Sequence, residues 1–292
     1  MYIIEITIFI LIGYLFAKCT QLEWINAKYI LQLVLYIFVT SLIIDSVYKS
    51  ENLIKNSFDF FCYVLLIGFL LVLLPHLYCK MRKLTGNNAK VLLSTSTLMN
   101  CGYIGIPACY LIGGEDYKQY ATFFTIIYTP LIIIYSSYLF SNRKDSNIKK
   151  FIMDPFLNSF FIGIILIYFS KILNLNFIIA IIHKISLSTP SIMLITTGIV
   201  FSTIKETFSF ISVEATIARF INGLIVLLIF FSLVDIKISL YRTTLALQTL
   251  MPIGILPYLI ATNSNEKING LGFSIILSTI IWLIAGLLFH MV

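Results

Sequence analysis

The stretch "LMNCGYIGIPACYLIGG", Leu98 to Gly114, lies in an apolar segment that is long enough to cross a bilayer, yet it is a poor continuous helix. It contains the amide side chain of Asn100, four glycines and Pro107. Proline removes a backbone N–H, glycine weakens a helix, and in hydrocarbon every freed backbone group needs a new partner. The stretch therefore predicts a polar, interrupted helix inside a membrane.

The composition supports a membrane location for the whole chain. Of the 292 residues, 59% are hydrophobic and 11% are charged, and the mean hydropathy is +0.98. Soluble domains carry roughly 25% charged residues, so this surface could not be kept in water. The N-terminal run Met1–Ala17 has Glu5, no basic leader and no cleavage site, and we expect it to be a retained first span.

Apolar segments of about 20 residues are the length that crosses a bilayer. By this criterion we expect ten transmembrane helices, an all-α polytopic membrane protein. The expected spans are about 2–18, 28–47, 58–79, 89–112, 119–140, 155–172, 178–203, 211–233, 240–261 and 268–291.

The basic residues predict the orientation. The odd-numbered loops hold most of the 20 lysines and arginines, with clusters around Lys80–Lys83 and Arg143–Lys150. Because positive loops stay in the cytoplasm, both termini should be extracytoplasmic and the protein should be multi-pass in the cell membrane. The net charge of +7 sits in short loops, so we expect no nucleic-acid partner.

The ten spans divide into two halves, residues 1–150 and 151–292, each with five helices. Two homologous halves with an odd number of spans insert in opposite orientations, which makes them inverted repeats. The fourth span of one half reads "YIGIPACYLIG" and the fourth of the other reads "PIGILPYLIA". This similarity matches Gly105 with Gly254 and places Thr249 opposite Asn100.

Paired spans with Gly/Pro interruptions at matching positions of inverted halves indicate the binding site of a secondary transporter. Half-helix N-termini favour negative charge, and an amide side chain offers both a donor and an acceptor. The candidate substrate-binding residues are Asn100, Gly102, Tyr103, Gly105, Pro107, Gln248, Thr249, Pro252, Gly254 and Pro257.

These residues resemble the auxin efflux carrier family, which includes plant auxin carriers and bacterial malate and malonate permeases. The pattern Asn-x-Gly-aromatic-x-Gly-x-Pro is present from Asn100 to Pro107, and "DPFLNSFFIGIIL" with Asp154–Pro155 and "ALQTLMPIGILP" also resemble family segments. The resemblance implies ten helices in two inverted five-helix repeats, with broken helices four and nine crossing at prolines. The chain departs from the family at Thr40, where a proline is common, and at Thr249 beside Gln248.

The expected function is therefore transport of a small organic anion, a mono- or dicarboxylate, by alternating access. Amides at Asn100 and Gln248 can hold a carboxylate without a buried Arg or Lys. Arg219 and Glu214 are interpreted as a pair near the cytoplasmic face. The expected partners are an organic acid and the lipid bilayer, and a homodimer stays open.

Three alternatives remain. A cation or proton antiporter of the same architecture needs midplane carboxylates, but the acidic residues, among them Asp45, lie near span ends. A membrane scaffold or sensor is the second alternative. An enzyme is the third, and it is disfavoured because the sequence has no H-E-x-x-H, no G-x-S-x-G and no acidic metal cluster. We expect no cofactor, no metal, no catalytic residues and buried, unreactive cysteines.

Overall fold

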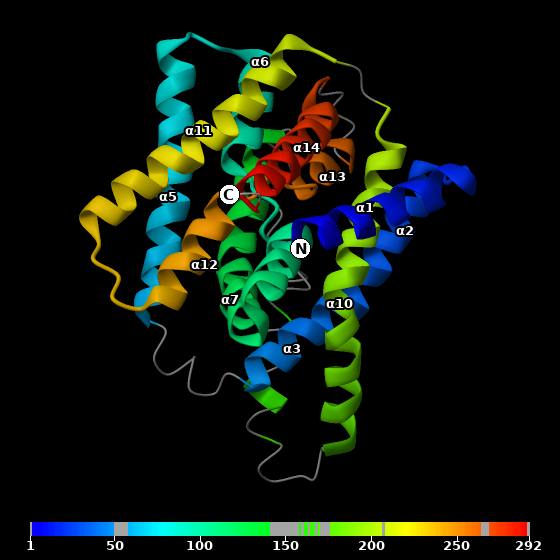
Figure 1. Cartoon of the computed structure of the whole chain (residues 1–292). Coiled ribbons are helices and arrows are strands. Elements are labelled where there is room, and N and C mark those ends of the chain that lie inside the picture. Colours follow the sequence, from blue (N-terminus) through cyan, green and yellow to red (C-terminus); the bar gives the residue numbers. More distant parts are fainter. Residues whose placement is uncertain are drawn as a thin grey trace.

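A computed structural model of the chain describes residues 2–49, 58–140, 176–205, 208–263 and 269–290, with a few isolated residues between 158 and 169. The described residues form helices, and their single β-bridge joins Met99 to Ile253 (Figure 1). The elements are α1 (Tyr2–Cys19), α2 (Trp24–Leu33), η1 (Val34–Val39), α3 (Thr40–Lys49), α5 (Phe58–Met81), α6 (Gly86–Thr97), η2 (Cys101–Gly105), α7 (Ile106–Phe140), α10 (Asn176–Thr203), α11 (Phe210–Leu233), α12 (Ser239–Thr249), α13 (Leu256–Asn263) and α14 (Leu271–His290).

Seven helical stretches among the described residues are long and apolar enough to cross a membrane. They match the predicted first, second, third, fifth, seventh, eighth and tenth spans in position. The predicted sixth span, 155–172, falls largely outside the described residues, as do Asp154–Pro155 and the proposed boundary at residue 150. The prediction of an all-helical, multi-pass membrane protein is confirmed.

The predicted fourth and ninth spans contain no single helix of membrane-spanning length. The fourth consists of α6, an irregular stretch at Leu98–Asn100, the π-helical turn η2 and the first part of α7. The ninth consists of α12 and α13, separated by residues 250–255. A sharp kink at Gly114, whose φ of 74° suits glycine, separates the end of this fourth segment from the fifth.

The second predicted span is continuous from Trp24 to Lys49 but turns π-helical at η1. A π-helical turn leaves carbonyls displaced from their normal partners. The hydroxyl of Thr40 donates to the carbonyl of Leu35 at 3.1 Å, and Thr189 of α10 donates to the carbonyl of Phe38 at 3.1 Å. The resemblance leads one to expect a proline at position 40. The hydroxyl of Thr40 instead provides a hydrogen-bond donor for one carbonyl of this distorted helix.

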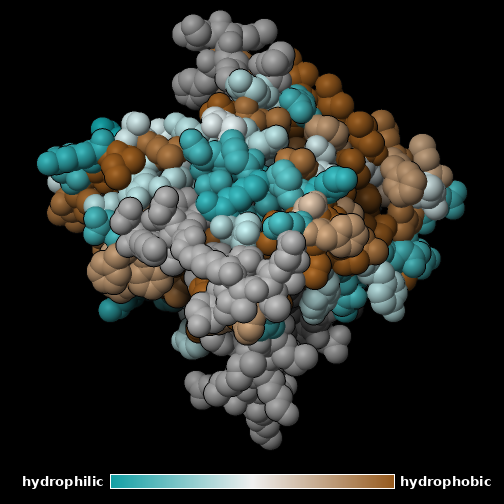
Figure 2. Space-filling model, turned by 90° about the horizontal axis from the view of Figure 1, so that it is seen from below, coloured by the Kyte–Doolittle hydropathy of each residue, from teal (hydrophilic) through white to brown (hydrophobic). Residues whose placement is uncertain are grey.

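The outer surface is largely hydrophobic, as a lipid-facing surface requires. Large apolar side chains are exposed along α1, α5 and α11, among them Leu15, Phe69 and Leu228. Seen from below, the molecule has hydrophilic side chains gathered in the middle of the face and hydrophobic ones along part of its edge (Figure 2). The five cysteines are free; three are buried, whereas Cys19 and Cys62 are exposed, so the expectation of burial is wrong for these two.

Different loops and helix ends lie at the two ends of the helical bundle. The link between α5 and α6 and the start of α11 lie at the upper end in Figure 1, and the end of α3 and the start of α10 lie at the lower end. Helix α1 packs along α10, and α6 packs along α11. The two interrupted segments meet between these ends.

Candidate functional site

The two interrupted segments cross as a short antiparallel pair. The backbone N–H of Asn100 donates to the carbonyl of Pro252 at 2.7 Å, and the N–H of Gly254 donates to the carbonyl of Leu98 at 2.8 Å. Each break thereby satisfies backbone groups that the other leaves open, as hydrocarbon demands. In this pairing Asn100 lies opposite Pro252 and Gly254 lies opposite Leu98.

Of Pro107, Pro252 and Pro257, it is Pro252 that lies at the crossing. Pro252 offers its carbonyl there, because a proline cannot continue the helical N–H ladder of α12. Pro257 instead occupies the first turn of α13, where proline is tolerated, and Pro107 lies just after the π-helical turn η2, within the helical stretch that begins at Cys101. The expectation that Pro107 marks the crossing is wrong, since the chain has already broken at Leu98–Asn100.

Glycines permit the close approach at the crossing. A Cβ on Gly254 would lie 2.9 Å from the carbonyl oxygen of Met99, and one on Gly105 would overlap the side-chain amide of Gln248. Contacts under 3.0 Å require something to shift, and at Gly254 the neighbour is backbone, which cannot move away cheaply. Packing therefore requires glycine at position 254, whereas at position 105 the side chain of Gln248 would have to shift.

A cavity of about 210 Å³ opens beside the crossing. It is lined by the residues that follow each break, together with one face of α2 and part of α7: Met99, Asn100, Cys101, Gly102, Tyr103, Gly254, Ile255, Leu256, Leu259, Lys28, Leu31, Gln32, Leu35, Thr125, Thr129 and Ile132. The residues after a break begin a helix, and the first N–H groups of a helix have no partner within it. The cavity is thus bordered by two helix N-terminal ends.

Asn100 lines this cavity and carries a buried amide group without a partner. Its residue is 3% exposed, and its Nδ2 atom is buried without a hydrogen-bond partner. A buried unpaired amide costs free energy, roughly 1–3 kcal/mol. A ligand acceptor that reached this atom would remove that cost.

The predicted residues separate into two groups. Asn100, Gly102, Tyr103 and Gly254 line the cavity. The other six do not line it: Gly105, Pro107, Gln248, Thr249, Pro252 and Pro257. The Nε2 of Gln248 donates to the Sγ of Cys109 at 3.8 Å, and its Oε1 and the hydroxyl of Thr249 are buried without partners, which places this pair behind Gly105.

The structure also brings Arg219 to the crossing, which the sequence reasoning missed. Arg219 is fully buried in α11, and its guanidinium donates to the carbonyls of Met251 at 3.1 Å, Ser96 at 3.5 Å and Thr249. It therefore binds both segments just before their breaks. The expectation that the site has no buried cation is wrong.

The interpretation of Arg219 and Glu214 as a pair is also wrong. Residues five apart on a helix face different directions, whereas those three or four apart are neighbours. Glu214 instead accepts a hydrogen bond from the hydroxyl of Tyr78 at 3.0 Å and lies 3.7 Å from Arg82. Asn222, one turn after Arg219 and on the same face, donates to the carbonyls of Ser96 at 3.0 Å and Leu71 at 3.1 Å.

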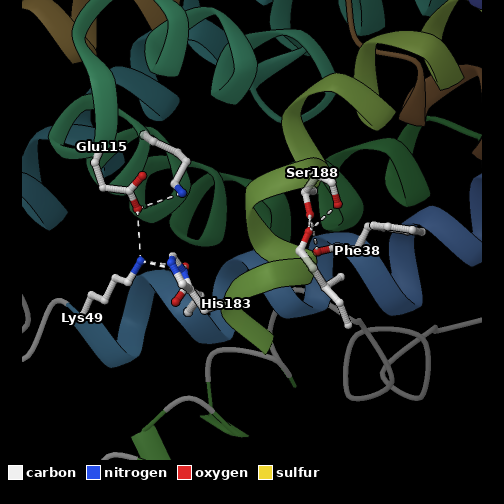
Figure 3. Close-up of polar contacts among 9 residues, drawn as sticks. Phe38, Lys49, Glu115, His183 and Ser188 are labelled. Carbon is white, nitrogen blue, oxygen red and sulfur yellow. Dashed lines mark hydrogen bonds and ion pairs between the residues drawn. The ribbon is translucent and has the colours of Figure 1, made fainter. Parts of the chain in front are cut away.

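A cluster of charged side chains joins α3, α7 and α10 (Figure 3). The carboxylate of Asp45 lies 3.2 Å from Lys49 and 3.2 Å from His183, and Glu115 lies 3.7 Å from Lys49 and 2.8 Å from Lys118. Asp45 is 2% exposed, so it is not the solvent-reaching end residue that the sequence suggested. Glu115 follows the kink at Gly114, which turns it toward Lys49. We call these five residues the ion cluster.

The cavity and the ion cluster lie at opposite ends of one helical segment. Lys28 lines the cavity near the start of Trp24–Lys49, and Lys49 ends the same segment. At 1.5 Å per residue, the two lysines are separated by roughly 30 Å along the helix. The ion cluster is therefore on the side away from the cavity's α2 wall.

Another cavity, of about 500 Å³, lies between α5, α6 and α11. Most of its lining side chains are apolar, including Phe210, Ile217 and Ile221, which are exposed on the lipid-facing surface. It contains neither break of the two interrupted segments, so the smaller cavity at Asn100 is the better candidate site.

Comparisons with known proteins agree with this geometry. A sequence profile of the family described as membrane transport protein matches residues 1–150. An uncharacterized transporter of Methanocaldococcus jannaschii is 26% identical over 291 residues, which cover 95% of this chain and 93% of that protein. The chain therefore belongs to the membrane transport protein family, the auxin efflux carrier family that its Asn100–Pro107 motif resembles.

Proposed function

We propose that this protein is a secondary transporter that moves a small organic anion, a mono- or dicarboxylate, through the cavity at Asn100. Membership in a family of membrane transporters supports transport over scaffolding, sensing or enzymatic chemistry. The class of substrate is inferred from the chemistry of the cavity.

The single observation that carries the proposal is the unpaired Nδ2 of Asn100. An N–H group donates to anions, and it is this end of the amide, rather than the Oδ1 atom, that is buried without a partner. Two helix N-terminal ends border the same cavity, and each favours negative charge. None of the side chains that line this cavity is acidic, which disfavours the alternative of a cation or proton antiporter.

The positions of the cavity and the ion cluster support alternating access. A ligand at Asn100 would lie in a cavity whose wall is partly formed by α2. At the other end of the segment Trp24–Lys49, the ion cluster connects α3 and α10 to α7. Transport would then require the ion pairs of the cluster to separate while the α2 side closes. Opening at one side of the site while the other side closes is the motion expected between the halves of an inverted-repeat transporter.

The full architecture is part of the proposal. Ten helices in two inverted five-helix repeats, residues 1–150 and 151–292, account for two interrupted segments that cross at matching places in the chain. Lys80, Arg82 and Lys83 would lie in the cytoplasm, with both termini outside the cell membrane.

Cysteine labelling tests this orientation. In a cysteine-free background, a single cysteine at Arg82 should be protected from an impermeant thiol reagent applied to intact cells. A cysteine at Lys237, an exposed position between α11 and α12 and on the opposite side, should react. If the cysteine in the α5–α6 loop were labelled and the one in the α11–α12 loop protected, the orientation of the protein would be opposite to the proposed one.

A ligand screen tests the substrate class. Ligands that bind only the folded protein stabilise it by about 2.7 kcal/mol at one hundred times their Kd. We expect small carboxylates to raise the melting temperature of the purified protein, and the corresponding neutral amides to leave it unchanged. In Asn100→Ala the carboxylates should lose their effect. Equal shifts with acids and amides, or shifts with metal cations alone, would contradict the proposal.

A further inference from the structure

The cavity of about 500 Å³ lies on the lipid-facing side of the molecule, where α5, α6 and α11 pack together (Figure 1). Its walls are mostly apolar and include Leu74, Leu92 and Ile217. Small-molecule sites are usually cavities of roughly 300–1,000 Å³ with apolar walls and a few polar groups that fix the orientation of the ligand. We call this space the lipid-side cavity.

Two buried polar residues form part of the lining, Ser96 of α6 and Asn222 of α11. Ser96 is 1% exposed and Asn222 is 6% exposed. Within the part of the chain that the structure describes, the Oγ of Ser96 and the Oδ1 of Asn222 have no hydrogen-bond partner. Each unpaired buried atom costs roughly 1–3 kcal/mol, and lipid tails cannot supply the missing bonds. A ligand that bonded to both atoms would remove this cost.

The helices determine which end of the Asn222 amide is left over. Pro75 has no N–H, so the carbonyl of Leu71, one turn earlier on α5, has lost its helical partner. The Nδ2 of Asn222 donates to this carbonyl at 3.1 Å and to the carbonyl of Ser96 at 3.0 Å. Both partners are acceptors, so the nitrogen must face them and the oxygen must face away. The remaining atom of the amide therefore requires a hydrogen-bond donor.

Together the two unpaired atoms suit a hydroxyl group. A hydroxyl donates one hydrogen bond, which the Oδ1 of Asn222 can accept, and it accepts one, which the hydroxyl of Ser96 can donate. A carboxylate has no proton to donate to Asn222, and it would be repelled by Glu214, which also lines the cavity. An ammonium group would lose its hydration among apolar walls. The lining therefore favours a neutral molecule with a hydroxyl group and an apolar body.

This pair of residues lies below a polar rim. Glu214 and Tyr78 line the other part of the cavity, where the hydroxyl of Tyr78 donates to Glu214 at 3.0 Å. At 1.5 Å per residue, Glu214 and Asn222 are roughly 12 Å apart along α11. Between them on the same helix, Ile217 and Ile221 line the cavity and are exposed at the lipid-facing surface. A ligand can therefore enter from the bilayer, through the side of the molecule.

We propose that the lipid-side cavity binds a neutral, unbranched apolar molecule with one hydroxyl group, of which a long-chain alcohol is the simplest example. Its hydroxyl donates to Asn222 and accepts from Ser96, and its chain lies between α5 and α11. Because Ser96 belongs to the last turn of α6, the occupant connects α6 to α11. The site is separate from the cavity at Asn100, and the inference does not depend on the proposed transport of organic anions.

Photolabelling of the purified protein in liposomes tests the ligand chemistry. The probe is 1-decanol with a diazirine at the far end of its chain, and the labelled peptides are identified by mass spectrometry. We expect saturable labelling of α5 and α11 that 1-decanol competes away, whereas decane, which lacks the hydroxyl, and decanesulfonate, which is charged, do not. Equal competition by decane, or labelling that never saturates, would overturn the proposal.

Ser96→Ala tests the site, with Ser94→Ala as its matched control. Ser94 is also a buried serine of α6, but its hydroxyl donates to Val91 of the same helix at 3.0 Å and it does not line the cavity. The Oγ of Ser96 has no bond within the described part of the protein to lose, so Ser96→Ala should fold. It should weaken labelling about 2- to 10-fold in apparent affinity, whereas Ser94→Ala should match the wild type.

Wild-type affinity in Ser96→Ala, or an equal loss in both serine variants, would contradict a hydroxyl site at this residue. If Ser96→Ala does not fold, Ile221→Trp decides, because Ile221 lies at the exposed opening of the cavity and tolerates a larger side chain toward lipid. The indole ring should block entry and abolish the saturable labelling. Undiminished labelling of α5 and α11 in Ile221→Trp would place the alcohol outside the cavity.

Discussion

Replacing Asn100 by alanine is expected to lower carboxylate flux by about 10- to 100-fold while leaving the protein folded. Hydrogen bonds to charged groups contribute roughly 1.5–3 kcal/mol, and each 1.4 kcal/mol is a factor of ten. The fold should tolerate the change because the Nδ2 of Asn100 has no partner to lose. The measurement is the initial rate of radiolabelled carboxylate uptake in proteoliposomes, with the melting temperature of the same preparation.

Asn222→Ala is the matched control for this prediction. Asn222 is also a buried asparagine, but its amide donates to the carbonyls of Ser96 and Leu71, so its loss removes two buried hydrogen bonds. We expect Asn222→Ala to lower the melting temperature and Asn100→Ala to keep it. Asn100→Asp should also stop flux, since a fixed carboxylate would occupy the place of the substrate. If Asn100→Ala transports carboxylates at the wild-type rate, Asn100 is not part of the substrate-binding site.

Gly254→Ala is expected to separate the two interrupted segments. The added methyl group would press on the carbonyl of Met99 and stretch the bond from the N–H of Gly254 to Leu98. Overpacking of this kind costs about 1–3 kcal/mol. Both the melting temperature and the affinity for a carboxylate should fall, because the cavity is built on this pairing.

Ser232→Ala, on the exposed side of α11, provides the reference for an alanine substitution that the fold tolerates. Melting temperatures and ligand-induced shifts of the two variants should be measured side by side. If Gly254→Ala matches Ser232→Ala in both, the close approach at the crossing is not required for stability or for binding.

The sequence was sufficient for those features that depend on composition and local chemistry. Hydropathy located the seven spans that the structure describes as long helices, and the glycines and prolines around Asn100 and Pro252 indicated which two segments are interrupted. The motif from Asn100 to Pro107 identified the family. These features can be recognised within short stretches of sequence, because a bilayer restricts both the length of a span and the residues that a continuous helix can contain.

The sequence was not sufficient for features that depend on which segments meet. Pro107 looked like the break, but the break lies at Leu98–Asn100, and Pro107 follows the π-helical turn η2. Arg219 was interpreted by its distance from Glu214 along one helix, whereas its partners are carbonyls of two other segments. Asp45 and His183 lie 3.2 Å apart across α3 and α10, a contact that no spacing in the sequence reveals.

The most direct test of anion transport is the uptake of radiolabelled solutes into liposomes containing the purified wild-type protein, compared with protein-free liposomes. We expect saturable, protein-dependent uptake of a small carboxylate that its unlabelled form competes away and its neutral amide does not. Uptake of sodium or another cation without any carboxylate would contradict the proposal that this protein transports organic anions.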